Sequence, residues 1–321
     1  MINNKEKNFI SIVAYFYNNP QSCLNFFKAV EDSRIFSDHS ENYEIIIVND
    51  GSDPKKLDEI KNGLKTNCHF KQINFVNMSK YQGIEAAINA GNDFAIGDFI
   101  YEFDTLEINY DIDLIFQVYE KALEGFDIVS AVPNKTEKLS SGLFYAIYNA
   151  SLHQGKLYPE TFRIISRRAW NRIKSLSISI PYRKAIYANC GLRLTHIFYK
   201  NLYKQKWAYS SPEKKNRVSL ATDSLIIFTN LVEKIALSLS AFFGFFTIIV
   251  LAYTICIYLG ANKPVEGWAP LMGVISLSFF GLFCLMTAII KYLSIILKMV
   301  FSHQNYLIES TEKIVFEVKN D

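Results

Sequence analysis

Apolar and polar residues alternate in blocks over the first part of the chain. Near-continuous apolar runs, which are typical of strands buried on both faces of a sheet, occupy residues 9–17, 44–48, 70–76, 99–103 and 127–132. Segments with the spacing of helices follow these runs at residues 21–33, 55–65, 84–95 and 111–124. Strands that alternate with helices in this way predict a doubly wound, Rossmann-like α/β sheet.

A second pattern begins near residue 235. Residues 235–259 and 271–290 are runs of 25 and 20 residues without a charged side chain, each long enough to cross a bilayer. Trp268 stands in the short connection as an interface anchor, and cations cluster before the first run and after the second. This pattern predicts a two-helix transmembrane hairpin with both termini in the cytosol. A buried hairpin of a soluble protein is the alternative.

The two patterns divide the chain into four parts. We expect a soluble domain at residues 1–217, an amphipathic membrane-surface segment at 218–234, the two spans within 235–298 and a cytosolic tail at 299–321. The polar N-terminal residues do not resemble a secretory signal, which favours a cytosolic location for the soluble part.

Charge and cysteine content argue against several function classes. The net charge of +3 is too small to indicate binding to nucleic acid, although cations and aromatic residues intermingle at 180–217. Beside a membrane segment, we expect those cations to meet lipid headgroups and phosphate. The five cysteines are scattered without a CxxC pair, which argues against zinc and a disulfide framework and fits a reducing compartment.

The candidate chemistry centres on two acids at the end of the 99–103 run. Successive strand residues point to opposite faces, so Glu102 and Asp104 share a face. Two acids there are costly to bury unless a cation lies between them. One candidate is a divalent metal that holds a polyphosphate, since Mg²⁺ and Mn²⁺ prefer carboxylate oxygens. The other is an Arg or Lys partner, and the pattern leaves both open.

Polar residues recur at the ends of three predicted strands. Asn18, Asp50 and Asp104 each follow an apolar run in a separate strand–helix unit. Ligands of doubly wound sheets bind beyond the carboxyl ends of the strands. The recurrence therefore indicates a binding site at this edge of the sheet.

The ordered motifs resemble those of a known family. They occupy residues 13–18, 49–53, 78–83 and 161–168, and are followed by a membrane-surface segment at 221–225 and Gly267-Trp268 at the second span. This set resembles the family-2 glycosyltransferases of the GT-A fold, a doubly wound mixed sheet. Within them it is most similar to the membrane-anchored polyisoprenyl-phosphate glycosyltransferases. The chain departs from the family at Tyr15 (Pro in the family), Asn49 (an acid) and Tyr81 (Asn).

The metal motif is the main departure. The family carries D-x-D, and alignment from Gly97-Asp98 puts its first Asp on Asp104 and its second on Leu106, which cannot bind metal. We prefer Glu102 and Asp104 as the ligand pair, since both are acids on one strand face, with Glu107 in reserve.

The resemblance implies a role for each motif residue. The implied nucleotide-sugar-binding residues are Tyr17, Asn18, Asp50, Ser52, Lys80 and Gly83. The implied ligands for Mg²⁺ or Mn²⁺ are Glu102 and Asp104, and the implied catalytic residues are Asp104 and Glu160. The implied acceptor-phosphate residues are Arg163, Arg167 and Arg183. Glu160 stands nearest to the family's candidate base. Toward an acceptor that is already anionic, it would orient or tune rather than remove a proton. The alternatives are structural: Asp50 caps a turn, Arg163 pairs with an acid, and Arg183 is surface charge.

The implied reaction is inverting transfer of a sugar from a UDP- or GDP-linked donor to a polyprenyl phosphate at the cytosolic face of a bacterial membrane. The expected partners are this donor, the lipid acceptor and the bilayer, with a homo-oligomer as a further option and no nucleic acid. Two alternatives stay open: transfer to a lipid-linked glycan or surface polysaccharide, and a catalytically drifted, membrane-anchored nucleotide-binding or scaffold protein.

Overall fold

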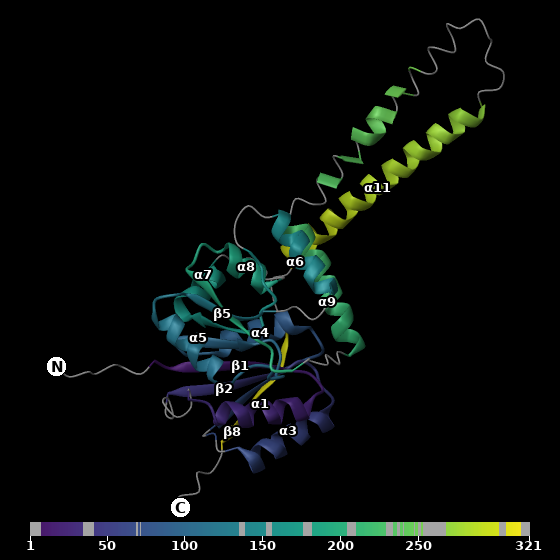
Figure 1. Ribbon diagram of the computed structural model, residues 1–321. Helices are drawn as coiled ribbons and strands as arrows, with labels where there is room; N and C mark the ends of the chain where they lie inside the picture. Colours follow the sequence, from purple (N-terminus) through teal and green to yellow (C-terminus); the bar gives the residue numbers. More distant parts are fainter. Residues whose placement is uncertain are drawn as a thin grey trace, which may run out of the picture. The chain divides into compact units, whose positions relative to one another are not determined.

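The structure is a computed structural model of the chain (Figure 1). It describes residues 8–34, 42–68, 70, 72–134, 139–151, 156–175, 182–203, 210–228, 234–235, 238–239, 241–246, 248–249, 252, 268–301 and 306–315. Two compact units divide the chain, Met1–Ala221 with His303–Asp321, and Thr222–Ser302. Each unit is described by itself below.

An eight-stranded mixed sheet forms the centre of the first unit, in the order β7-β5-β6-β4-β1-β2-β3-β8. Its parallel heart consists of β1 (Ile10–Phe16), β2 (Tyr43–Asn49), β3 (Gln72–Met78) and β4 (Phe99–Phe103). These are four of the predicted apolar runs, and their residues are buried on both faces almost throughout. The predicted α/β fold is therefore confirmed.

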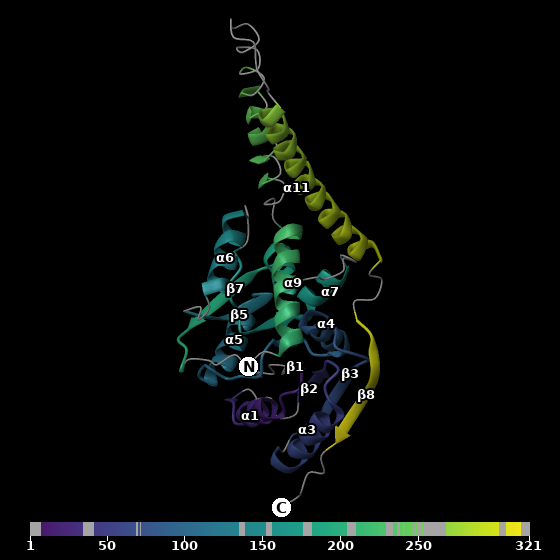
Figure 2. The same ribbon diagram turned by 90° about the vertical axis from the view of Figure 1, so that its right-hand side faces the viewer.

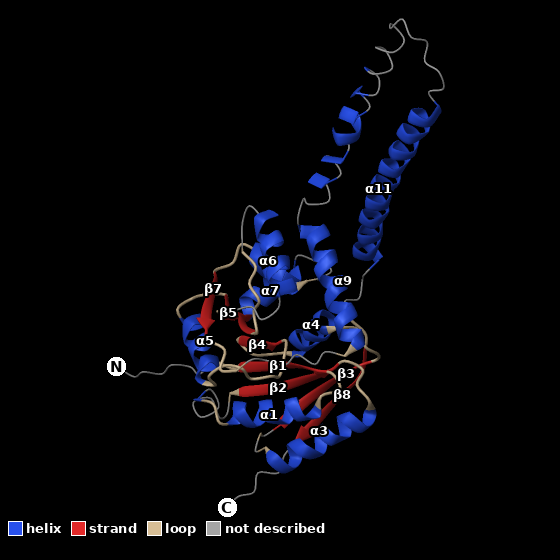
Figure 3. Ribbon diagram, turned by 45° about the vertical axis from the view of Figure 1, so that its right-hand side comes forward, coloured by secondary structure: helices blue, strands red, loops and turns tan. Residues whose placement is uncertain are grey.

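Helices cover both faces of this sheet (Figure 3). The helices α1 (Pro20–Glu31), α3 (Pro54–Asn67) and α5 (Asp113–Leu123) lie on one face, where the apolar core of the unit sits. Asn19 and Asp53 begin α1 and α3, because each side chain accepts a backbone hydrogen bond of the first turn and a proline follows.

The opposite face carries α4 (Ile84–Phe94), which approaches the sheet unusually closely. A Cβ added to Gly91 would lie 2.3 Å from Val13 Cγ1 and 2.8 Å from Val48 Cγ2, so only glycine fits there. This small-residue packing brings the buried polar residues Glu85 and Asn92 of α4 against the sheet.

The second half of the unit inserts an antiparallel strand. It comprises β5 (Ile128–Pro133), α6 (Leu139–Ser151), β6 (Phe162–Ser166), α7 (Arg167–Ser175), α8 (Arg183–Asn189) and β7 (Leu194–Tyr199). The strand β6 lies between β4 and β5 and runs against both. Its register places Arg163 directly opposite Glu102. The pattern of apolar residues did not predict α8 and β7.

The C-terminal residues contribute a strand to the sheet. Within residues 299–321, which the sequence analysis expects to be a cytosolic tail, β8 (Ile308–Val315) pairs antiparallel with β3 at the edge of the sheet (Figure 2). The exchange of backbone hydrogen bonds along β3 makes this segment part of the first unit.

The second unit contains α11 (Trp268–Phe301), and α9 (Ser211–Phe228) leads from the first unit into it. Among the described residues, one stretch is long and apolar enough to cross a membrane, Leu277–Ile296. It overlaps the second predicted span. Most of the first predicted span, 235–259, lies outside the described residues, and its described pieces are helical. The two-helix hairpin and the membrane-surface segment therefore stay predictions.

Gly97 offers a test of the close packing before β4. A Cβ at this position would lie 2.6 Å from Ser11 N and 2.8 Å from Phe9 O, both backbone atoms that cannot move aside freely. We expect Gly97→Ala to lower the free energy of unfolding by about 1–3 kcal/mol in urea unfolding followed by circular dichroism.

Gly142→Ala is the matched control. Gly142 lies in α6 with nothing within 4 Å of an added Cβ. Alanine there should stabilise the helix by up to about 1 kcal/mol. Equal unfolding free energies for the two variants would contradict the packing described.

Candidate active site

The predicted donor-binding residues form one connected group of loops at the carboxyl ends of β1, β2 and β3. Asn18, with a left-handed φ of 51°, donates its backbone N–H to Ser52 Oγ at 3.0 Å. The Asn18 side chain accepts from Asp53 N at 2.8 Å. The rings of Tyr17 and Tyr81 lie 4.7 Å apart, which joins the first loop to the third.

Asp50 sits beneath these loops and is fully buried. Its carboxylate accepts from Gln82 N at 2.7 Å and from Gly83 N at 2.8 Å, while Tyr15 Oη lies 3.4 Å away. Burial raises the pKa of Asp50 to about 6, against the lowering effect of the two backbone hydrogen bonds. The side chain thus holds the backbone turn just before α4, and its predicted contact with a nucleotide stays a prediction.

The 79–83 loop, which contains Lys80 and Gly83, is held from several sides. At Gly51, where φ is +66°, an added Cβ would lie 2.5 Å from Tyr81 N, so the turn after β2 presses on this loop. The backbone of Leu307 exchanges two hydrogen bonds with the side chain of Gln82, at 2.7 and 2.8 Å. Asn216 of α9 packs on Gly83. Segments before and after the second unit therefore both fix this loop.

Seven charged side chains meet at the carboxyl end of β4. We call them the charge cluster: Glu85, Glu102, Asp104, Glu160, Arg163, Arg183 and Lys184. They come from α4, the end of β4 and the residue that follows it, the loop before β6, β6 itself and α8. The side chains of Arg163, Arg183 and Glu102 have no exposed surface, and those of Asp104 and Lys184 are each 11% exposed.

Glu102 is saturated with donors. Its Oε2 accepts from Arg163 Nη1 at 2.5 Å and from Arg183 Nη1 at 2.8 Å. Its Oε1 accepts from Asn92 Nδ2 at 2.6 Å and from Tyr187 Oη at 2.5 Å. A buried carboxylate needs such partners, because it has lost its water.

Asp104 completes the arrangement at the edge of the cluster. Its Oδ2 accepts from Arg163 Nη2 at 2.9 Å and its Oδ1 from Arg183 Nη2 at 2.8 Å, with Lys184 Nζ 3.4 Å from Oδ2. Burial alone would raise the pKa of Asp104, but the charges of Arg163, Arg183 and Lys184 hold it well below its usual range. Asp104 is therefore ionised at neutral pH.

Glu160 joins the cluster through Arg163. Its Oε2 accepts from Arg163 Nε at 2.8 Å, and its Oε1 lies 4.0 Å from His196 Nδ1. Burial lowers the pKa of His196 despite this neighbouring acid, so the imidazole is neutral at pH 7. The structure thus brings the predicted base beside Asp104, with an arginine between them.

The donor set of the charge cluster does not fit a divalent metal. Both oxygens of Glu102 and both of Asp104 already accept from guanidinium, amide or hydroxyl groups. Leu106, at the position of the family's second acid, belongs to the apolar core. Among the described residues, no three His, Cys, Asp or Glu side chains gather as a metal site. The cation between the two acids is the Arg partner, the second of the two candidates.

The predicted acceptor-phosphate arginines separate into two locations. Arg163 and Arg183 lie together in the charge cluster, bound to carboxylates. Arg167 lies apart from them. Because β6 runs antiparallel to β4, Arg167 lies at the far end of β4, where it donates to the backbone oxygens of Gly97 and Ala95 at 2.9 and 2.7 Å.

Four members of the site were missed by sequence reasoning. Glu85 and Asn92 belong to a helix singled out only for its small residues, and Lys184 and Tyr187 belong to α8, which was not predicted. The one signal that pointed to Glu85 and Asn92 was their place in an otherwise small and apolar helix. Only the fold shows that α8 folds back onto the end of β4.

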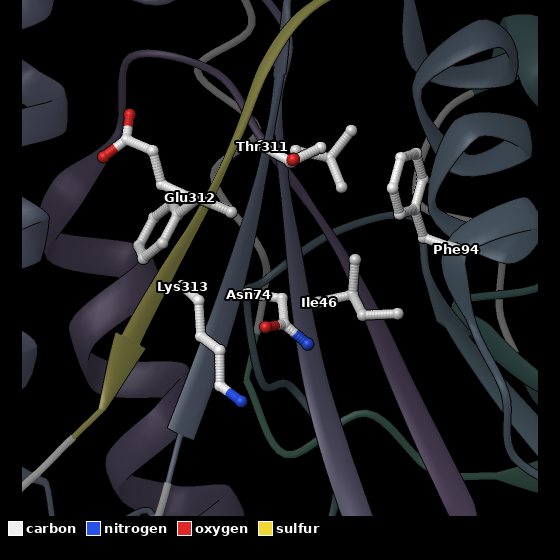
Figure 4. A pocket seen from close by; sticks show the side chains of 8 residues that line it. Ile46, Asn74, Phe94, Thr311, Glu312 and Lys313 are labelled. Atoms are coloured by element: carbon white, nitrogen blue, oxygen red, sulfur yellow. The ribbon is translucent and has the colours of Figure 1, made fainter.

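A shallow hollow lies elsewhere on the sheet. It has a volume of about 260 Å³ and is bordered by Ile46 of β2, Asn74 of β3, residues 311–313 of β8 and Phe94 of α4 (Figure 4). None of the residues of the charge cluster or of the donor loops lines it.

Comparison with known families defines the class of protein. The model described as glycosyl transferase family 2 matches residues 11–174, about half of the chain. The chain therefore belongs to glycosyl transferase family 2. The family predicted from the motifs is confirmed, and with it the GT-A type of fold and glycosyltransferase chemistry with a nucleotide-sugar donor.

Individual relatives share less than a third of their residues with this chain. The uncharacterized glycosyltransferase sll0501 of Synechocystis sp. is 27% identical over 283 residues, 85% of each chain. The uncharacterized glycosyltransferase YkcC of Bacillus subtilis is 26% identical over 260 residues, 78% of each chain. Among solved structures, the mannosyltransferase PcManGT of Pyrobaculum calidifontis, in complex with GDP-Man and Mn²⁺, gives a TM-score of 0.45 at 12% identity, covering 87% of this chain and 88% of that one.

Arg183 offers a test of the charge cluster. Removing a buried cation leaves Glu85, Glu102 and Asp104 partly unpaired. We expect Arg183→Leu to lower the free energy of unfolding by about 3–5 kcal/mol. Lys56→Met is the control, because Lys56 and Glu59 form an exposed pair, worth under about 1 kcal/mol. Similar losses in both variants would show that the cluster is not the buried network described.

Asp50 gives the protein a pH dependence of known sign. Its folded pKa of about 6 exceeds the ordinary value of 3.8, so protonation favours the folded chain. The resulting stability is complete below about pH 3.8 and is lost as the pH rises through 6. Over this window, we expect the wild type to lose about 2–3 kcal/mol relative to Asp50→Asn in urea unfolding. Parallel pH profiles of the two proteins would contradict this.

Proposed function

We propose that this protein transfers a sugar, with inversion, from a UDP- or GDP-linked donor to a polyprenyl phosphate in the cytosolic leaflet of a bacterial membrane. Family membership supports the glycosyltransferase part. The apolar stretch Leu277–Ile296 supports a membrane location for the acceptor. The single observation that carries the proposal is the placement of the charge cluster at the carboxyl end of β4, beside the edge where the donor loops gather.

The donor would lie across the carboxyl ends of the parallel strands. Its nucleoside would contact the loops that contain Tyr17, Asn18, Ser52 and Lys80, above the buried Asp50. Its diphosphate would face the exposed part of the charge cluster, at Asp104 and Lys184. This assignment keeps the nucleotide-binding roles that the sequence predicts for Tyr17, Asn18, Ser52 and Lys80.

The reaction needs little base catalysis. An oxygen of the acceptor phosphate, already anionic at neutral pH, attacks the anomeric carbon as the bond to the donor diphosphate breaks. The bonding electron pair leaves with the nucleoside diphosphate, and no proton has to be removed. Glu160 would then hold Arg163 in place rather than act as a base, which agrees with its 2.8 Å contact to that side chain.

The Mg²⁺ or Mn²⁺ expected from the resemblance does not enter the proposed reaction, because the charge cluster offers no ligand set for it. Negative charge that develops on the leaving diphosphate still needs stabilisation by cations of the site.

A second candidate is a nucleotide-binding protein that has lost catalysis. The observation in its favour is that both oxygens of Asp104 are bound by arginines. Transfer to a lipid-linked glycan or surface polysaccharide keeps the same donor site and differs only in the acceptor.

Asp104→Asn tests the proposed function. Membranes that contain the wild-type protein should transfer labelled sugar from one of a panel of UDP- and GDP-sugars to polyprenyl phosphate. The variant should lose transfer by on the order of 10²-fold or more, because the carboxylate that positions Lys184 at the donor diphosphate and holds Arg163 and Arg183 beneath it is gone. A cooperative thermal melt of the variant above the assay temperature is the control for folding, because loss of a buried charge lowers Tm.

The outcomes separate the candidates. Donor binding without any product supports the catalytically inactive protein, and label found only in a glycan fraction supports the other acceptor class. Full transfer by folded Asp104→Asn would remove the role proposed for this residue.

A further inference from the structure

We propose that the guanidinium pair of Arg163 and Arg183 takes the place of the divalent ion in this protein, and that Lys184 presents the cation that stabilises the leaving diphosphate. The inference rests on the proposed function and adds to it a metal-independent mechanism and one further catalytic residue.

The first step of the argument is charge. Two acids on one face of the end of β4 would be unstable without a compensating charge of about +2 between them. Arg163 and Arg183 supply that charge as two single cations. Each guanidinium bridges the acids, with Nη1 on Glu102 and Nη2 on Asp104, at distances of 2.5 to 2.9 Å. The two guanidinium groups thus fill the space between the acids, and together they carry the same charge as one divalent metal ion.

The second step is the rigidity of this pair. The Nε of Arg163 donates to Glu160 and the Nε of Arg183 donates to Glu85, both at 2.8 Å. A divalent ion could enter only if it displaced these charge-assisted hydrogen bonds, which are about twice as strong as neutral ones. Glu85 and Glu160 would then remain buried without their partners, at 10% and 6% side-chain exposure.

The third step is the lost ligand. Leu106 stands where the family has the second acid, and its side chain packs in the apolar core. The fully buried Glu102 replaces that acid in charge but not in position, because its four hydrogen bonds face Arg163, Arg183, Asn92 and Tyr187. Glu102 is a positioning residue for the arginines.

The last step identifies the cation at the surface. Arg163 and Arg183 have no exposed surface, whereas the side chain of Lys184 is 11% exposed. Its Nζ donates to the backbone oxygen of Glu160 at 3.0 Å and lies 3.4 Å from Asp104 Oδ2. When the bond between sugar C1 and the diphosphate oxygen breaks, the electron pair stays on that oxygen. Lys184 donates a hydrogen bond to the diphosphate there, while the acceptor oxygen forms the new bond to C1.

The first experiment measures metal binding directly, on the full-length protein. Electron paramagnetic resonance of free Mn²⁺ should show no saturable loss of signal when wild-type protein is added. The Tm should shift by less than about 1 °C between EDTA and Mn²⁺, since an ion that binds the folded state raises Tm. Saturable Mn²⁺ binding that disappears in Glu102→Gln would overturn the inference. A lower Tm of Glu102→Gln that is insensitive to Mn²⁺ supports it.

The second experiment measures Lys184. We expect Lys184→Met to lower kcat by on the order of 10²-fold in EDTA, measured below the Tm of the variant, and Lys184→Arg to restore most of the rate. Lys174→Met is the matched control, because Lys174 is 60% exposed and pairs with Asp93. Unchanged kcat in Lys184→Met, or transfer by the wild type that is abolished by EDTA and restored by Mn²⁺, would overturn the inference.

A failure of the proposed transferase function gives different results from a failure of the inference about the arginines and Lys184. If no donor gives product in any condition, the transferase proposal fails, and the Mn²⁺ measurement still decides the role of the arginines. Lys184 is then judged by calorimetric titration with UDP and GDP in EDTA. Binding weakened by about 10-fold or more in Lys184→Met supports its contact with a diphosphate, and equal binding excludes that contact.

Discussion

The pairing of two buried acids with two buried arginines is the interaction on which the site depends. Glu102 and Asp104 are stable at the end of β4 only because Arg163 and Arg183 bridge them. The same pairing holds the pKa of Asp104 far below its usual range and, against the effect of burial, raises the pKa of Arg163 and Arg183. Asp104, Arg163 and Arg183 therefore carry their charges at neutral pH.

The topology of the sheet delivers these partners. The antiparallel strand β6 beside β4 brings Arg163 opposite Glu102. Because β6 runs toward the amino end of β4, Arg167, which follows β6, lies at that end. The helix α8 returns Arg183 and Lys184 to the edge where β4 ends. On the opposite side of the pair, the close contact of Gly91 with the sheet lets α4 supply Glu85 and Asn92.

The donor loops depend on contacts from distant parts of the chain. Asp50 fixes the start of α4, Gly51 presses on Tyr81, and Leu307 holds Gln82. Leu307 directly precedes β8, which follows the apolar helix α11 in sequence. The chain enters the second unit within α9 and returns before β8. Asn216, which precedes the second unit, and Leu307, which follows it, both contact the 79–83 loop. A restraint on either segment therefore acts on the loop that we assign to the nucleotide.

The sequence by itself determined the α/β class, the four central strands and the family, because these depend on local apolar patterns and on motifs contiguous in the chain. It also required a cation between Glu102 and Asp104, since strand geometry alone puts them on one face. Only the tertiary structure decided which cation this is. Arg163 and Arg183 lie about 60 and 80 residues from Glu102 in sequence, and pairings of that separation follow from strand order and helix packing rather than from local pattern. For the same reason, α8, β7, β8 and the distant location of Arg167 became visible only in the folded chain.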